Sequence, residues 1–442
     1  MIDLVVRGGT LVTPSGQRRA DVAIEGGRIR EVSPDVESGV EEIDARGLHV
    51  LPGVIDVHLH FNEPGRTDWE GAATGSRALA AGGGMLFFDM PLNSTPCTVN
   101  AREFDRKRAA LEASSVTDFG LWGGLVPGSV PDMAEMADRG VVGFKAFMCH
   151  SGLPEFPRAD DVTLFDGLRE AARLGRPVAV HAESEELTRG LAGRITARTA
   201  RAFLDSRPVL AELEAIQRAL LLAKEAQAPL HIVHVSSGRC VALAAEARAQ
   251  GVDVSIETCP HYLYFTDEDV ERLGTVAKCA PPLRTIDEQQ ALWDELVRGH
   301  VHIVASDHSP APASMKGGDF VSAWGGIAGV QSTLGVLLDS GCHLRGLPLE
   351  RVTSLLAAEP ARRFRIAGKG SLDEGMDADL AVVDLNDQFT LAPGDLHQRH
   401  PFSPYVGRSF RGRVRQTIRR GETIFNDGRI TASGRGRLVR PL

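Results

Sequence analysis

The chain has 442 residues, of which 43% are hydrophobic, and this length allows a barrel-sized domain together with a smaller one. Its formal net charge of −9 argues against a nucleic-acid-binding surface. No stretch approaches the ~18–20 consecutive apolar residues of a membrane-spanning helix, so we expect no membrane partner.

The two ends of the chain carry the same pattern of short apolar segments separated by glycine turns. This pattern runs through 21–24 near the start and returns in 378–384 and 422–425 near the end. Alternating residues with such turns are typical of hairpins, and neither end could bury an apolar face alone. We therefore predict that residues 1–51 and 370–442 form one small β-sandwich domain.

Between the two ends, apolar runs that finish in polar residues alternate with helical stretches such as 212–226 and 238–250. The apolar runs are 85–88, 141–147, 177–181, 230–235, 252–257 and 301–306. Continuous hydrophobicity is what strands buried on both faces require. Strand–helix alternation over this length predicts an α/β fold in which residues 52–369 form a (β/α)8 barrel.

Two histidines, His58 and His60, close the first apolar run of the barrel segment, 53–60. Successive side chains of a strand alternate between faces, so both imidazoles point to the same side. Two such imidazoles can hold a metal ion. Because the spacing alone is a weak signal, a pair of surface histidines stays open as the alternative.

Polar residues at the ends of the later runs strengthen the metal interpretation. They are Lys145, His181, His234 and Asp307. In a barrel of this type the carboxyl ends of the strands meet at one rim, where the chemistry takes place. Four histidines, one carboxylate and one lysine are therefore predicted to converge.

Lys145 is the unusual member of this set, because an ammonium group is costly to bury and does not bind a cation. One interpretation is a lysine whose long side chain reaches solvent. The other is a neutral amine that has captured carbon dioxide. The resulting carbamate is an anion with two oxygens and can bridge two metal ions.

The other histidines are weighed separately. His231 lies on the opposite face of its strand from His234 and is expected to pack rather than bind metal. His261 follows a strand and could touch the site, and His308 adjoins Asp307 and could support it. Structural or surface roles are expected for the rest, which are His49, His300, His302, His343, His397 and His400.

Ordered motifs along nearly the whole chain resemble those of the cyclic amidohydrolases, and among them the allantoinases. They are 52–60, 63–66, 69–71, 90–93, 143–148, 206–208, 234–237, 257–262, 306–310, 323–329 and 403–408. The resemblance implies hydrolysis of a ring amide of allantoin, as the small-molecule substrate, to allantoate by a metal-bridging hydroxide. It also implies a homo-oligomer, a tetramer in many relatives.

By the same resemblance, six residues are the ligands of a binuclear metal centre: His58, His60, N6-carboxylated Lys145, His181, His234 and Asp307. The metals are usually zinc in relatives, with cobalt, manganese and iron as alternatives, and carbon dioxide or bicarbonate would carboxylate Lys145. Asp307 would also be the catalytic acid and base.

Two positions bear on the choice of substrate. Dihydroorotases carry cationic residues where this chain has Asn62 and Ala311, and those cations hold a carboxylate. Allantoin has a polar ureido tail instead, with which the amide of Asn62 can form hydrogen bonds in both senses. Asn93 and Asn62 are predicted to orient the substrate.

Hydantoinases and dihydropyrimidinases are the closer alternative. They usually have a tyrosine that polarises the ring carbonyl where this chain has His150, and the role of His150 stays open. Ala280 and Gly325 occupy positions of largely backbone substrate contacts in those relatives. A non-catalytic binding homologue is a further alternative.

Cysteine usage and the N-terminus bear on the compartment. The six cysteines are scattered without a Cys-x-x-Cys motif, which suits a reducing compartment better than a disulfide framework. The first residues lack the basic and apolar regions of a signal peptide. A cytoplasmic protein is therefore expected.

Overall fold

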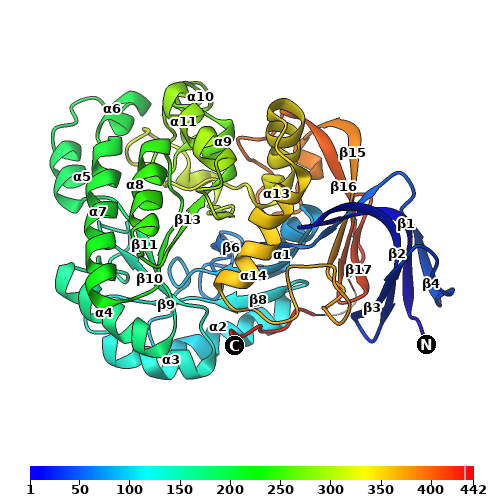
Figure 1. The fold of residues 1–442 in the computed structure, drawn as a ribbon. Coiled ribbons are helices and arrows are strands. Elements are labelled where there is room, and N and C mark those ends of the chain that lie inside the picture. The colour runs from blue at the N-terminus through cyan, green and yellow to red at the C-terminus, as the bar shows by residue number, and fades with distance from the viewer. Residues whose placement is uncertain (433–434) are drawn as a thin grey trace.

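Strands from both ends of the chain lie in one nine-stranded sheet in the computed structural model, which describes residues 1–432 and 435–442 (Figure 1). Its order is β18-β17-β16-β15-β5-β1-β2-β3, with β4 paired to β1. The strands are β1 (Leu4–Thr13), β2 (Gly16–Glu25), β3 (Arg28–Ser33), β4 (Glu41–Asp44), β5 (His49–Pro52), β15 (Leu380–Thr390), β16 (Ser409–Arg419), β17 (Glu422–Asn426) and β18 (Arg429–Ile430).

The sheet folds over a core to which both ends of the chain contribute. Val6 and Val22 from the N-terminal strands lie in the same buried cluster as Val382 and Ile418 from the C-terminal strands. β5 joins the halves, because it pairs with β1 on one side and with β15 on the other. The predicted β-sandwich domain built from both ends is confirmed.

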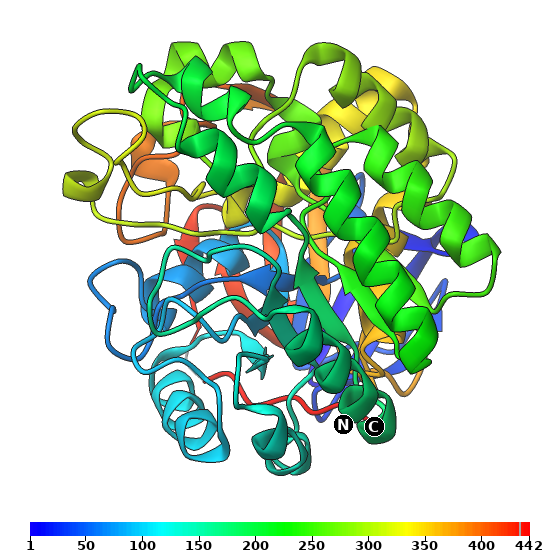
Figure 2. The same ribbon diagram turned by 90° about the vertical axis from the view of Figure 1, so that its left-hand side faces the viewer.

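Two stretches near the C-terminus leave this sheet and lie against the barrel. In the first, the backbone N–H of Arg399 donates to Glu70 Oε1 at 3.0 Å. In the second, the N–H of Val439 donates to the carbonyl of Phe119 at 2.7 Å, which extends the sheet edge at β8. Unpaired backbone groups at a buried edge need partners, and the C-terminal tail, red in Figure 2, supplies them.

The barrel strands run in the order β6-β7-β8 and β9-β10-β11-β12-β13-β14, all parallel. They are β6 (Val54–Leu59), β7 (Gly84–Asp89), β8 (Asp118–Leu121), β9 (Gly123–Gly124), β10 (Phe144–Phe147), β11 (Val178–His181), β12 (Leu230–Ile232), β13 (Val254–Thr258) and β14 (Ile303–Val304). β8 and β9 act as one strand interrupted at Trp122. The ring closes where Leu59 bridges His308, and the predicted (β/α)8 barrel is confirmed.

Helices surround the barrel and connect its strands (Figures 1 and 2). They are α1 (Ala72–Ala81), α2 (Ala101–Ser114), α3 (Met133–Arg139), α4 (Asp161–Leu174), α5 (Glu185–Ala192), α6 (Ala200–Asp205), α7 (Val209–Ala226), α8 (Gly238–Ala249), α9 (Pro260–Tyr264), α10 (Asp267–Leu273), α11 (Ile286–Val297), α12 (Thr333–Val336), α13 (Leu349–Thr353) and α14 (Glu359–Arg363). Within the described ranges, none combines the length and apolarity needed to cross a bilayer.

α4 illustrates why these segments are helical. The Asp160 side chain accepts a hydrogen bond from the backbone N–H of Thr163, which caps the first turn. Leu164 and Leu168 recur at helical spacing and are buried against the barrel. Gly175 ends the helix with φ 62°, a left-handed conformation that glycine adopts without strain.

Large side chains fill the barrel at the end opposite the carboxyl ends of its strands. The open end therefore lies at the carboxyl ends. Trp122 is fully buried, and its indole N–H donates to the carbonyl of Val57 at 2.9 Å. Phe364 packs edge-on against Trp122 and against His231, with ring centroids 5.3 and 5.4 Å apart. A site for substrate is therefore expected at the carboxyl ends of the strands.

Candidate metal centre and active site

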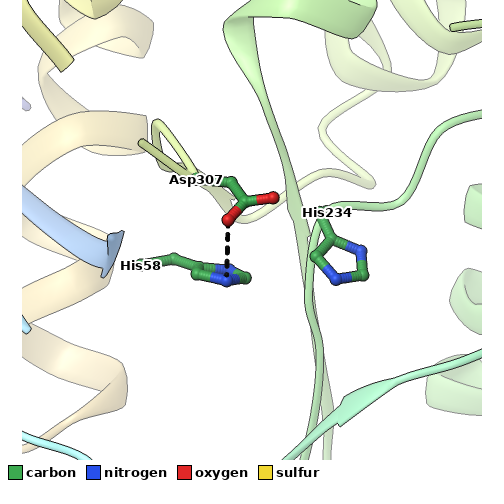
Figure 3. Close-up of side chains that lie close together, drawn as sticks. All are labelled: His58, His234 and Asp307. Atoms are coloured by element: carbon green, nitrogen blue, oxygen red, sulfur yellow. Dashed lines mark ion pairs between the residues drawn. The ribbon is translucent and has the colours of Figure 1, made fainter. Parts of the chain in front are cut away.

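The first ligand pair and the predicted catalytic carboxylate meet at this rim. His58 lies near the end of β6, His60 follows it, and both rings face Asp307 (Figure 3 shows His58 and Asp307). The Nε2 atoms of His58 and His60 lie 3.3 and 3.4 Å from Asp307 Oδ1. The period-two prediction that both imidazoles share one side is met by this geometry.

The remaining predicted ligands come from the next strands round the barrel. His181 ends β11, and its ring centroid lies 4.6 Å from that of His234, which follows β12. Lys145 lies in β10 opposite Ala179 of β11. Ligand atoms of His58, His234 and Asp307 all lie within 4.8 Å of one another, a spacing that one metal ion can span (Figure 3).

The donor set fits divalent metal ions. His60 Nδ1, His234 Nδ1 and Lys145 Nζ are buried, and none has a hydrogen-bond partner among the described residues. Orphaned buried polar atoms cost stability, and a carboxyl group on the Lys145 amine, bound to metal ions, would satisfy Lys145 Nζ. Imidazole and carboxylate donors also suit zinc and neighbouring transition metals.

The protonation states favour metal binding as well. Burial lowers the pKa of His60, of His181 and, most strongly, of His234, so these imidazoles are neutral at pH 7. For Asp307, burial acts to raise the pKa, but the neighbouring His58 and His60 outweigh it and lower the pKa well below its usual range. The carboxylate is therefore ionised and can accept a proton.

Lys145 does not reach solvent, since its exposed fraction is 0%. The alternative of a lysine that extends to the surface is therefore wrong. Burial lowers the pKa of Lys145 to about 8, against the opposing effect of Asp307 and Glu257. A neutral amine is then accessible near physiological pH, as carbamate formation requires.

Glu257, on β13, holds two of the predicted ligands in place but is absent from the residues predicted from sequence. Its Oε1 is 2.7 Å from His58 Nδ1 and accepts the backbone N–H of His234, while Oε2 is 2.9 Å from His231 Nε2. Burial acts to raise the pKa of Glu257, but His58 and His231 lower it to about 2. His231 thus packs behind the site, as predicted. A carboxylate inside a buried strand was the signal that could have indicated Glu257.

Glu183 orients His181 in a similar way. Its Oε2 lies 2.7 Å from His181 Nε2, which leaves His181 Nδ1 for a metal ion. Arg207 forms an ion pair with the same carboxylate oxygen. Burial would raise the pKa of Glu183, but Arg207 and His181 lower it to about 2. The second carboxylate therefore stays ionised and holds the imidazole in one orientation.

A cavity of about 570 Å³ opens above the ligands. Among the residues predicted to contact substrate, Asn93, His150, Ala280 and Gly325 line it. Asn62 does not belong to the lining, because its side chain is buried and its Nδ2 donates to the carbonyl of Pro310 at 3.4 Å. A direct role for Asn62 in binding substrate stays a prediction.

The backbone is strained at several of these positions. His234 and Asp307 have φ 41° and 42°, and Asn62 and Asn93 have φ 62° and 68°. Asparagine, aspartate and histidine enter this left-handed region more often than other side chains do, but at a cost of about 1–3 kcal/mol for each residue held there. These turns end β12 and β14 earlier than the hydrophobic runs predict, and they direct the ligands inward.

Comparison with known proteins shows the family of this chain. A model of the amidohydrolase family matches residues 49–424. The chain belongs to the amidohydrolase family. It is 62% identical to the allantoinase of Solibacter usitatus over 100% of this chain and 97% of that one, and 60% identical to the allantoinase of Rubrobacter xylanophilus over 99% and 98%.

Solved structures give the same assignment. The L-hydantoinase (dihydropyrimidinase) from Arthrobacter aurescens is 33% identical, with a TM-score of 0.97 over 100% of both chains. The dihydropyrimidinase from Brevibacillus agri is 29% identical, with a TM-score of 0.93 over 100% of this chain and 99% of that one. The protein is thus an amidohydrolase in both sequence and fold.

Two further histidines of this amidohydrolase lie close to the ligands. His308 Nδ1 accepts the backbone N–H of Gly329 at 3.1 Å, and its Nε2 lies 3.6 Å from Glu70 Oε2, so His308 supports the loop beside Asp307. His261 is buried, and burial lowers its pKa to about 4. His261 does not line the cavity, so no substrate contact is assigned to it.

Replacing Glu257 by glutamine should weaken metal binding by this amidohydrolase about 10–100-fold, because the charge that orients His58 and His234 is lost. Competition with a chelator, followed by metal analysis, measures the effect. Glu246→Gln, an exposed carboxylate on α8, is the matched control. Unchanged affinity in Glu257→Gln would contradict an orienting role.

Proposed function

We propose that this amidohydrolase is an allantoinase, which hydrolyses a ring amide of allantoin to give allantoate. The observation that carries the proposal is 62% identity, over the whole chain, to an allantoinase. The convergence of six ligand-type residues at the barrel rim supports a hydrolytic enzyme over a non-catalytic homologue, which would not need them.

Six residues would hold two metal ions: His58, His60, Lys145, His181, His234 and Asp307. We propose that Lys145 does so as a carbamate, whose two oxygens replace the cationic amine by an anion. When bound, divalent ions supply a Lewis acid for the carbonyl and acidify water. Zinc is proposed, because it suits imidazole and carboxylate donors.

Asp307 moves the proton in this proposal. Its ionised carboxylate accepts a proton from the attacking water and delivers it to the departing ring nitrogen. The two transfers follow one another, so one group can serve as base and then as acid. Asn93, on the cavity wall, would orient the ring, and His150 would donate to substrate from the opposite loop.

The charge of the ring substituent helps to choose between allantoin and the substrates of the alternative enzymes. The likeness to the Arthrobacter L-hydantoinase favours a hydantoinase as the second candidate. The cationic residues that hold a carboxylate in dihydroorotases have no counterpart here, because Asn62 and Ala311 are uncharged. A neutral, polar substituent therefore suits this chain better than an anionic one.

A substrate panel tests the proposal. Purified enzyme, supplemented with zinc and bicarbonate, should hydrolyse allantoin with a kcat/KM at least about 10-fold above those for hydantoin, dihydrouracil and dihydroorotate, the range that one polar group can supply. The same samples without metal supplementation are the control. Preference for hydantoin or dihydrouracil would overturn the substrate while leaving the metal site in place.

The assembly and the compartment complete the proposal. All six cysteines are free thiols, which supports a reducing compartment such as the cytoplasm.

A homotetramer is proposed on the resemblance to the cyclic amidohydrolases. Light scattering coupled to gel filtration distinguishes a tetramer from smaller species.

A further inference from the structure

One wall of the cavity carries a carboxylate for which the reaction described above has no use. Glu185 is the first residue of α5, is 7% exposed and lines the cavity with His58, Lys145 and His181. Its Oε2 accepts the backbone N–H of His150 at 2.8 Å. Its Oε1 accepts no hydrogen bond from the residues that the structure describes, and the guanidinium of Arg189 lies 3.6 Å away.

A guanidinium lies on the same wall. Arg207 forms an ion pair with Glu183 through Nη1. Because a guanidinium has five N–H donors, this contact leaves donors for a ligand. Both Arg207 and Glu185 line the cavity, and the attraction between their charges acts on the pKa of Arg207.

The charged groups of this wall have both signs. Glu185, Arg189 and Arg207 line the cavity, and Glu183, which is fully buried and does not line it, forms an ion pair with Arg207. A ligand group that fits here donates a hydrogen bond to Glu185 and accepts one from a guanidinium group. A carboxylate substituent would be repelled by the carboxylate of Glu185. A purely apolar substituent would displace water from Glu185 Oε1 without giving that oxygen a hydrogen bond, which is costly.

We propose that Glu185 is a specificity-determining residue that accepts an N–H of the ureido tail of the substrate, while Arg207 donates to the carbonyl of that tail. A urea group has both N–H donors and a carbonyl acceptor on one planar, neutral unit, and so matches this wall. The assignment rests on the proposed allantoinase function. It adds the part of the site that recognises the ring substituent.

Glu185 also holds the loop that follows β10 through its contact with His150, so a loss of activity alone would not distinguish binding from a structural role. The two roles differ in their dependence on substrate. A loop disturbance lowers the hydrolysis of every ring substrate by a similar factor. Loss of a contact to the tail affects allantoin and spares a ring that has no tail.

The experiment therefore compares kcat/KM for allantoin and for unsubstituted hydantoin in wild type, Glu185→Ala and Glu185→Gln. The ratio of the allantoin value to the hydantoin value should fall about 10–100-fold in Glu185→Ala, as expected for a lost hydrogen bond to a charged group. In Glu185→Gln the ratio should also fall, because the single amide oxygen cannot replace both the carboxylate oxygen that accepts from the His150 N–H and the one that accepts from the tail. If hydantoin turns over too slowly, its inhibition constant against allantoin replaces its kcat/KM.

Glu186→Ala is the matched control, since this neighbouring carboxylate on α5 is exposed. In Glu186→Ala, the ratio of kcat/KM for allantoin to kcat/KM for hydantoin should equal that of wild type. An equal loss for both substrates in Glu185→Ala would overturn the assignment and leave the allantoinase proposal standing. Wild-type enzyme that hydrolyses hydantoin but not allantoin would overturn both.

Discussion

Asp307→Asn should lower kcat about 10³–10⁴-fold while leaving the fold intact, because an amide cannot accept the proton of the attacking water. The neighbouring His58 and His60 keep the wild-type carboxylate ionised, so it is poised to act as a base at neutral pH. Steady-state kinetics on allantoin measures the loss. Thermal unfolding and metal analysis of the same sample show whether fold and ions are retained.

The control for this variant is Asp294→Asn, because Asp294 is an exposed aspartate on α11 that does not line the cavity. It should retain wild-type kcat and metal content. Metal-loaded Asp307→Asn with wild-type turnover would show that another group moves the proton. Glu257 and Glu183 could not easily take its place, because each is already engaged by two positively charged or imidazole partners.

Lys145→Ala should lose both bound metal and activity, the activity by at least about 10³-fold, because the anion that would hold two ions together is removed. The truncated side chain leaves a space in a site where the lysine is fully buried. Short carboxylic acids such as formate or acetate, added with zinc, should restore part of the activity by supplying two oxygens there. Metal content and hydrolysis rate are followed as the acid concentration is raised.

Lys224→Ala is the control for this experiment, because Lys224 lies exposed at the end of α7 and should tolerate truncation. Isotope-labelled bicarbonate provides a second readout, since wild type should incorporate the label at Lys145 and the variant should not. Full activity and metal content in Lys145→Ala would contradict a carbamate at this position.

Much of the candidate site follows from local sequence pattern. The pairing of His58 with His60 depends only on the two-residue period of a strand. Lys145 stands out because an ammonium is out of place in an apolar run. The positions of His181 and His234 follow from the rule that parallel strands present their carboxyl ends at one rim.

Residues that the sequence pattern did not predict make contacts between strands that are distant in the chain. Glu257 contacts His58, which is 199 residues away along the chain, and only the register of the strands brings them within 2.7 Å. The backbone of Asn62 has φ 62° and its amide donates toward Pro310, and its contact with substrate stays a prediction. A period-two pattern does not extend past the end of a strand, so the direction of Asn62 could not be read from it.

Sequence pattern was sufficient to predict the α/β class, the strand ends at which the candidate ligands lie and the pairing of the two chain ends, because hydrophobic periodicity and turn residues act over short distances. Contacts between distant segments set the carboxylates that orient those residues, the polar groups that share the cavity wall and the points at which the strands stop. Those features depend on barrel closure between Leu59 and His308 and on positive φ at His234 and Asp307. Such strained turns persist only because packing from distant segments holds them.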